Sequence, residues 1–227
     1  MKGNKIFDSK LEKVGSFAGN VDERQIKNEP MLFNCRYHGA CRLGGPITRS
    51  FLANLPDGWK DDVVIDTRVH MLMPGWFPAI PGYHHDDVPR PPIPVGQHFS
   101  TAGQPNYDDP EYYSEHILGL VGADVSPTNF ALGVSEFNQV PDGEIIYRQW
   151  HKEVEGKLVS GELELVKAED RTLYKFDWQT WHTCQAAVKH GWRWFGRISR
   201  NTDRAKKTTD EIRVNAQVYM ELPYNGW

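Results

Sequence analysis

Two imidazoles and two carboxylates occupy four consecutive positions, between segments rich in proline and glycine. Alternate side chains of an extended segment share a face, so His84 would point the same way as Asp86. His85 and Asp87 would then point the opposite way. Either pair offers one nitrogen and one oxygen to a metal. With His182 as a third ligand, the set would be the two histidines and one carboxylate that hold non-heme Fe(II) and leave positions open for chemistry.

The same stretch could also be a solvated loop, because polar clusters beside glycine and proline usually mark turns. The residues after His182 favour a functional metal site over a solvated loop. Segment 191–199 alternates like a strand and places Arg193, Arg197 and Ser199 on one face. Two arginines beside a metal are costly to bury unless they meet an anion, and a guanidinium matches a carboxylate with two parallel hydrogen bonds. The sequence therefore predicts a metal together with an arginine that binds a carboxylate.

This ordered set resembles the signature of the Fe(II)/2-oxoglutarate-dependent dioxygenases: His84-x-Asp86, then His182, then Arg193 within Gly-x-Arg. The match covers residues 63–200 and no single substrate-defined subfamily. The resemblance implies a mainly β chain with a double-stranded β-helix (jelly-roll) core and a few peripheral helices. It also implies an enzyme that uses Fe(II), 2-oxoglutarate and O2 to hydroxylate an organic substrate, with release of succinate and CO2.

The resemblance implies a role for particular residues. The metal ligands would be His84, Asp86 and His182. Tyr83 favours this register, because family members often carry an aromatic residue just before the first histidine. The register of His85 and Asp87 stays open, and these two residues could instead orient the ligands. A carboxylate at the Asp86 position argues against halogenation, for which the family uses a small residue there.

Arg193 would pair with the distal carboxylate of 2-oxoglutarate, and Arg197 is its rival for this role. If Arg197 is the anchor, Ser199 matches the small hydroxyl residue of the family's Arg-x-Ser pattern. Otherwise Arg197 could contact an anionic group of the substrate. Four tryptophans are candidates for the apolar walls of the site: Trp76, Trp181, Trp192 and Trp194.

The composition favours a loop-rich β architecture, since the 227 residues include 15 prolines, 20 glycines and 8 tryptophans. A net charge of −4 gives no basic surface for a nucleic-acid backbone or an anionic membrane. A small-molecule or nucleobase-containing substrate fits this charge. A nucleic-acid substrate would need a local basic groove, for which the candidates are Arg197, Arg200, Arg204, Lys206 and Lys207. The oligomeric state is not indicated.

The chain shows no apolar run of membrane-spanning length and no signal peptide, and its three cysteines do not resemble a disulfide framework. We therefore expect a cytoplasmic protein. Cys35-x2-His38-x2-Cys41 could supply three zinc ligands, but this spacing matches no common zinc module.

We find no repeat and no linker, which predicts a single domain over 1–227 with its core at 63–222 and a peripheral N-terminal segment at 1–60. Residues 1–30 are polar with weak periodicity, so this part could be frayed or peripheral. The predicted strands are 63–73, 129–137, 144–150, 172–178, 191–199 and 213–222. A hairpin is predicted at 157–167, short helices at 50–55 and 111–123, and a stiff proline-rich loop up to residue 110.

Two other functions fit the same residues. A cupin-type metal enzyme or a sugar-binding jelly roll would use His84, His85 and His182 without a cosubstrate. A non-catalytic β-sandwich that binds a partner would carry the histidines and aspartates on a surface loop. Failure to bind 2-oxoglutarate would favour the first, and failure to bind metal would favour the second.

Overall fold

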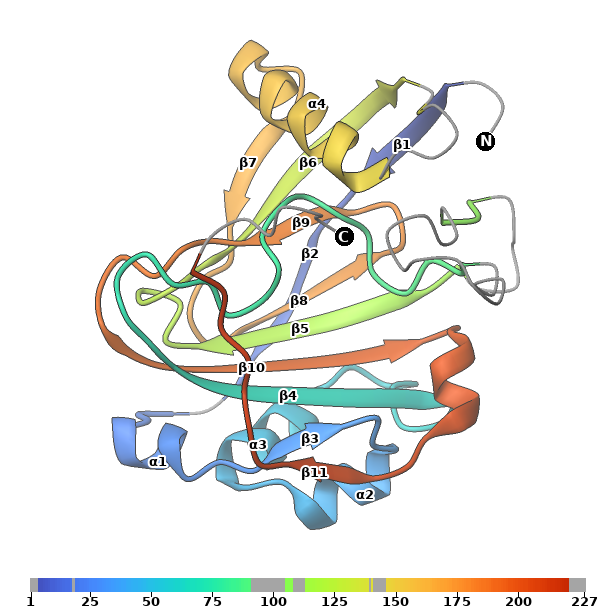
Figure 1. Ribbon diagram of the computed structural model, residues 1–227. Coiled ribbons are helices and arrows are strands. Elements are labelled where there is room, and N and C mark those ends of the chain that lie inside the picture. Colours follow the sequence, from blue (N-terminus) through green and yellow to red (C-terminus); the bar gives the residue numbers. More distant parts are fainter. Residues whose placement is uncertain are drawn as a thin grey trace, which may run out of the picture.

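The computed structural model describes residues 4–17, 19–90, 105–107, 113–138, 140 and 146–220. This part of the chain is mainly β, with two larger antiparallel sheets, one small sheet and four α-helices (Figure 1). The helices are α1 (Glu23–Lys27), α2 (Tyr37–Leu43), α3 (Pro46–Ala53) and α4 (Ile146–Ser160). A short 3₁₀ helix spans Asp203–Lys207.

The sheets bring together strands that are far apart in the sequence. The five-stranded sheet has the order β2 (Glu12–Ser16), β8 (Thr172–Asp177), β5 (Glu115–Val121), β10 (Gly191–Arg200), β4 (Val63–Leu72). In the four-stranded sheet, β6 (Thr128–Phe137) pairs with β1 (Lys5–Ser9), β7 (Glu164–Lys167) and β9 (Trp181–Cys184). The small sheet pairs β3 (Met31–Phe33) with β11 (Glu211–Arg213). All of these pairs are antiparallel, as in a β-sandwich.

Strand β10 divides its side chains between two environments. Trp194 and Ile198 are fully buried on the face that packs against the N-terminal helices, where the Trp194 ring lies 5.6 Å from the rings of Phe17 and Phe51. Arg193 and Arg197 alternate with them and point into the space between the sheets. The period of two therefore turns the apolar side chains Trp194 and Ile198 toward the helices and the two arginines toward the space between the sheets.

Helix α4 covers the outer face of the four-stranded sheet (Figure 1). Its buried residues Tyr147, Trp150 and Val154 pack with Phe137 of β6 and Trp181 of β9. With one sheet covered by α4 and the other by α1–α3, the inner faces are left to form the site.

Helix α3 is capped by a residue from a different segment. It begins after Gly45, which has no side chain to cap it. The buried Glu29 carboxylate accepts the N–H groups of Ile47 and Thr48, at 3.1 and 2.7 Å. An anion at this end also interacts favourably with the helix dipole.

We therefore expect Glu29→Gln to lower the free energy of unfolding by about 1 kcal/mol, within the range of measured N-cap losses. The amide keeps an acceptor oxygen but loses the charge and turns an N–H₂ group toward one of the helix N–H groups. Urea unfolding at equilibrium measures the change. Glu164→Gln, at an exposed position of β7, is the matched control and should stay within about 0.5 kcal/mol. Equal losses in both variants would contradict the capping role.

The strands predicted at 63–73, 129–137, 172–178 and 191–199 are confirmed as β4, β6, β8 and β10. The helix predicted at 50–55 is the second half of α3, which begins earlier, at Pro46. The loop predicted up to residue 110 lies mostly outside the described residues.

Other predictions were wrong. Residues 115–121 form a strand in place of a helix, because their continuous apolar run is buried on both faces of a central strand. Residues 146–160 form α4 in place of a strand and the first half of a hairpin, since their buried positions follow the helical period. The segment after Arg213 is irregular up to an isolated bridge at Tyr219. Among the described residues of the N-terminal segment, β1 and β2 pair with strands of the two larger sheets.

Candidate metal centre

A cavity of about 510 Å³ lies between the inner faces of the two larger sheets. Strands β4, β5 and β10 line it from one sheet, and β6 and β9 from the other. Residues 78–86 and the segment after β11 complete the wall. A volume of this size is typical of sites for small molecules.

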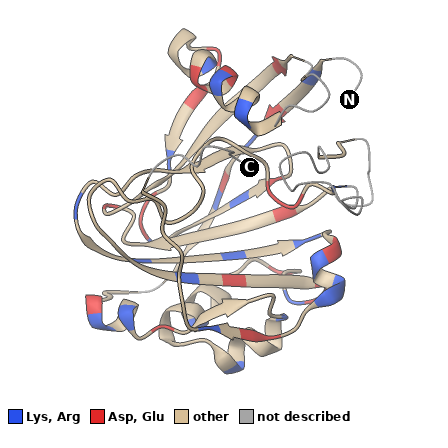
Figure 2. Ribbon diagram, in the orientation of Figure 1, with Lys and Arg blue, Asp and Glu red and all other residues tan. Residues whose placement is uncertain are grey.

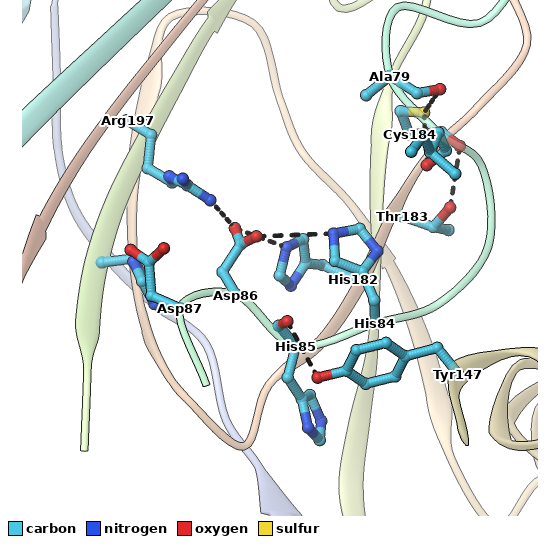
Figure 3. Close-up of polar contacts among 12 residues, drawn as sticks. Ala79, His84, His85, Asp86, Asp87, Tyr147, His182, Thr183, Cys184 and Arg197 are labelled. Carbon is cyan, nitrogen blue, oxygen red and sulfur yellow. Dashed lines mark hydrogen bonds and ion pairs between the residues drawn. The ribbon is translucent and has the colours of Figure 1, made fainter. Parts of the chain in front are cut away.

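Three side chains on the cavity wall could hold one metal ion. Nitrogen atoms of His84 and His182 and a carboxylate oxygen of Asp86 all lie within 4.8 Å of one another. His84 reaches this point because its backbone forms a bridge with His182 of β9, through hydrogen bonds of 3.2 and 3.3 Å. Figure 3 shows both imidazole rings turned toward the Asp86 carboxylate. In the described part of the chain, this is the one cluster with such spacing, and residues 35–41 provide no second one.

Backbone carbonyl groups fix the tautomer of both rings. Nδ1 of His84 lies 2.8 Å from the Gly82 oxygen, and Nδ1 of His182 lies 2.9 Å from the Thr180 oxygen. A carbonyl only accepts, so each Nδ1 carries the proton and the lone pair is left on Nε2. These Nε2 atoms lie 3.7 and 3.0 Å from the Asp86 carboxylate. Two lone pairs facing an anion repel it unless a cation lies between them, so the donor set fits a divalent ion such as Fe(II).

Burial keeps these groups in the states that bind metal. Burial lowers the pKa of His84 to about 3, so its ring is neutral at neutral pH. Burial alone would raise the pKa of Asp86, but the Arg197 guanidinium holds it well below its ordinary value. The carboxylate is therefore ionised.

Asp86 ends a chain of alternating charges. Arg197 contacts Asp86 and lies 3.7 Å from Asp66 of β4. Arg204 then bridges Asp66 and Asp87, at 2.5 and 3.3 Å. Although burial opposes it, Arg204 and Arg197 lower the pKa of Asp66. The chain fixes the Asp86 carboxylate toward the two histidines, as outer-shell partners of metal ligands do.

Arg193 is in a different situation. Its side chain is only 2% exposed, and it lines the cavity. Nε donates to the Ser126 carbonyl oxygen at 2.8 Å, and a terminal nitrogen donates to the Thr128 hydroxyl at 3.2 Å. Within the described residues no carboxylate pairs with it, and burial lowers the pKa of Arg193 to about 10. A buried cation of this kind lacks an anion.

The remaining predicted residues lie elsewhere. His85 points to the outer side of the sheet, with its ring 3.7 Å from that of Trp181 and its Nδ1 2.9 Å from the Tyr107 hydroxyl. Asp87 pairs with Arg204. The Ser199 hydroxyl is 2.7 Å from His116 and does not line the cavity. The tryptophans expected as walls all face away from the cavity, into packed clusters: Trp76, Trp181, Trp192 and Trp194.

The aromatic lining comes from Phe33, Phe195 and Tyr219, which sequence reasoning missed. Thr128 and Arg213 were also missed, because nothing in their local sequence indicates a site. The period of β4 puts Arg68 and His70 on one face with Asp66, and this face lines the cavity.

Four of the five residues named as candidates for a basic groove contact acidic side chains. Arg197 and Arg204 belong to the alternating chain of charges. Arg200 pairs with Glu115 at 2.6 Å and lies over the Trp59 ring, and Lys207 is 3.5 Å from Asp203. No described helix is both long and apolar enough to cross a membrane.

One pH effect follows from a buried histidine behind the site. His116 of β5 is fully buried, and burial lowers its pKa from 6.5 to about 4. The unfolded chain binds the proton first as the pH falls, so stability decreases through the window from 6.5 to about 4. We expect His116→Gln to reduce this loss by up to about 1.4 kcal/mol per pH unit.

Urea unfolding of metal-free protein across that window measures the slope of stability against pH. His190→Gln, at an exposed position, is the control and should keep the wild-type slope. If His116→Gln also keeps it, His116 is protonated in the folded state, and the assignment of its pKa is wrong.

The comparisons with known proteins are sparse. No family model matches the sequence. No curated protein matches it. A solved structure described as "Non-heme monooxygenase, ThoJ-Ni complex" aligns over 83% of this chain and 72% of that chain, at 8% identity and a TM-score of 0.38. A likeness this low carries no functional argument, so the function has to come from the residues of the site. The chain is mainly β, and its candidate metal centre consists of two histidines and one carboxylate.

Proposed function

We propose that this chain is a non-heme Fe(II)- and 2-oxoglutarate-dependent oxygenase that hydroxylates a small organic substrate. The observation that carries the proposal is the convergence of His84, Asp86 and His182 on one point of the cavity wall. Both rings turn Nε2 toward the Asp86 carboxylate, which is ionised. This donor set suits Fe(II) and leaves coordination positions open.

Bound Fe(II) with 2-oxoglutarate would supply the oxidising chemistry, in which O2 converts 2-oxoglutarate to succinate and CO2 and one oxygen atom enters a substrate C–H bond. The chain's own residues hold and orient the reactants. His84 and His182 are fixed by backbone carbonyls, and Asp86 by Arg197. The cavity walls, which come from both sheets, would limit contact between bulk water and the reacting groups.

Arg193 is the residue we propose for the distal carboxylate of 2-oxoglutarate. It is a buried cation on the cavity wall without an acidic partner, and Thr128 offers a hydroxyl next to it. Arg197 is less suited, because it already contacts Asp86 and Asp66. A guanidinium and a neighbouring hydroxyl together can hold both oxygens of a carboxylate.

We also propose that the core is a jelly roll within a single domain. After β4, the chain passes from one large sheet to the other: the bridge at His84 lies beside β9, β5 returns to the five-stranded sheet, and β6 and β7 lie in the four-stranded one. Strands β8, β9 and β10 alternate between these two sheets again. Repeated crossing between two sheets is the property that jelly rolls have.

Anaerobic addition of Fe(II) and 2-oxoglutarate to the metal-free protein tests the proposal. We expect a weak metal-to-ligand charge-transfer band in the visible spectrum when both are present. Fe(II) binding without the band would favour a cupin-type enzyme without a cosubstrate. Absence of Fe(II) binding would leave a non-catalytic β-sandwich.

A further inference from the structure

The cavity has a second cationic end, at the edge of the five-stranded sheet. Arg68 points inward from β4, and Arg213 comes from β11 in the small sheet. Both guanidinium groups lie over the Phe33 ring, at 5.6 and 3.4 Å from its centroid. In the described part of the chain neither pairs with a carboxylate. Burial lowers the pKa of Arg68, and the charge of Arg213 adds to this effect, although the Asp66 carboxylate acts in the opposite direction.

These two arginines are not used by the proposed chemistry. The alternating chain holds three carboxylates and two guanidinium groups, and a divalent metal would more than offset its single excess negative charge. Arg193 would be neutralised by one carboxylate of 2-oxoglutarate, while the other would lie at the metal. Arg68 donates to the Leu32 and Thr67 carbonyl oxygens, at 3.0 and 2.8 Å, so it and Arg213 remain as two positive charges without an ion pair among the described residues. Two like charges beside one ring repel each other, and an anion bound between them would offset this repulsion through charge-assisted hydrogen bonds.

We propose that Arg68 and Arg213 bind an oxyanion group of the substrate, so that the substrate is a small organic acid with a carboxylate, sulfonate or phosphate. This inference rests on the proposed function for the chemistry at the metal. It assigns a substrate class to the part of the cavity that metal and cosubstrate leave free. Phe33 would contact the apolar part next to the acidic group.

The strand register separates this site from that of the cosubstrate. Arg193 is opposite His70 on β4, and Arg68 is opposite Phe195 on β10. Arg68 is thus one strand across and two residues along from Arg193, which puts their Cα atoms about 8 Å apart. Figure 2 marks the basic positions on both strands. Two separate anions can therefore bind at the same time, one near each arginine.

The segment after β11 favours a small molecule over a polymer. Asn215, Gln217 and Tyr219 line the cavity at alternate positions. The segment is held to the rest of the fold by the Gln217 carbonyl, 3.2 Å from His70, and by two backbone hydrogen bonds between Tyr219 and Phe77, of 2.7 and 2.9 Å. In Figure 1 it runs across β4 and β10 toward the opposite sheet. A continuous chain of nucleotides or residues would have to displace it.

Calorimetric titration of the Zn(II)-loaded protein, saturated with 2-oxoglutarate, tests the inference. The probes are benzoate, benzenesulfonate, phenyl phosphate and neutral benzamide, which share one ring. We expect at least one of the anions to bind with a stoichiometry of one, at least tenfold more tightly than benzamide. Arg68→Gln and Arg213→Gln should each weaken it at least tenfold. Arg148→Gln, on the exposed side of α4, should not.

The outcomes separate this site from the proposed function. If the anions bind no better than benzamide, or if both variants bind them as the wild type does, the site is wrong. If an anion competes with 2-oxoglutarate, it occupies Arg193, and the site is also wrong. If 2-oxoglutarate fails to bind but an anion binds in a way that depends on Arg68 and Arg213, the site stands and the cosubstrate is wrong. Arg213 is exposed on β11, so its variant should fold even if Arg68→Gln does not.

Discussion

His182→Ala is expected to weaken Fe(II) binding more than about 100-fold and to abolish the charge-transfer band with 2-oxoglutarate. Changes to the partners of metal ligands alone cost about 10- to 100-fold in affinity, and removal of a ligand should cost more. Only His84 and Asp86 would remain to hold the ion. Anaerobic Fe(II) titration followed by visible absorbance measures both effects.

Two further variants make this result specific. The His182 ring also packs on Phe176, with centroids 5.1 Å apart, so alanine leaves a gap in the core. His182→Gln keeps most of the volume, and it should lose the band while unfolding near the wild-type temperature. His190→Ala, at an exposed position, should change neither property. A band that survives in both His182 variants would mean that the iron binds elsewhere.

The sequence allowed a close prediction of the residues that meet at the cavity wall. Strand period alone indicated that His84 and Asp86 share a face, and that Arg193 and Arg197 share another. The alternation of side chains along a strand could also have excluded Trp181, Trp192 and Trp194 from the cavity wall. Trp192 alternates with Arg193, as Trp181 does with His182, so each must face away from the site.

What the sequence could not indicate depends on contacts between distant segments. The Arg68 end of the cavity exists because β3 pairs with β11, which brings Phe33 beside Arg213. No local pattern marks a three-residue strand near each end of the chain. Likewise, the Glu29 carboxylate caps α3 only because the fold brings it there. Such pairings are decided by packing of the whole core, which propensity and period do not describe.

Arg193→Gln is expected to weaken 2-oxoglutarate binding by about 10- to 100-fold without lowering the stability of the ligand-free protein. Charge-assisted hydrogen bonds contribute about 1.5–3 kcal/mol, and each 1.4 kcal/mol is about tenfold in affinity. In the absence of ligand, Arg193 is a buried cation without an acidic partner. Its removal relieves a desolvation cost, and the glutamine amide can still donate to the Ser126 carbonyl.

Thermal unfolding of Zn(II)-loaded protein with and without 2-oxoglutarate separates these effects. At a ligand concentration of about 100 times the wild-type Kd, the wild type gains about 2.7 kcal/mol, and a variant that binds 100-fold more weakly gains about 0.4 kcal/mol. Arg148→Gln should behave as the wild type. Arg197→Gln is the decisive comparison, because Arg197 contacts Asp86 and should affect metal binding first. If Arg197→Gln loses the stabilisation by 2-oxoglutarate and Arg193→Gln keeps it, then Arg197 is the anchor and Arg193 has another anion.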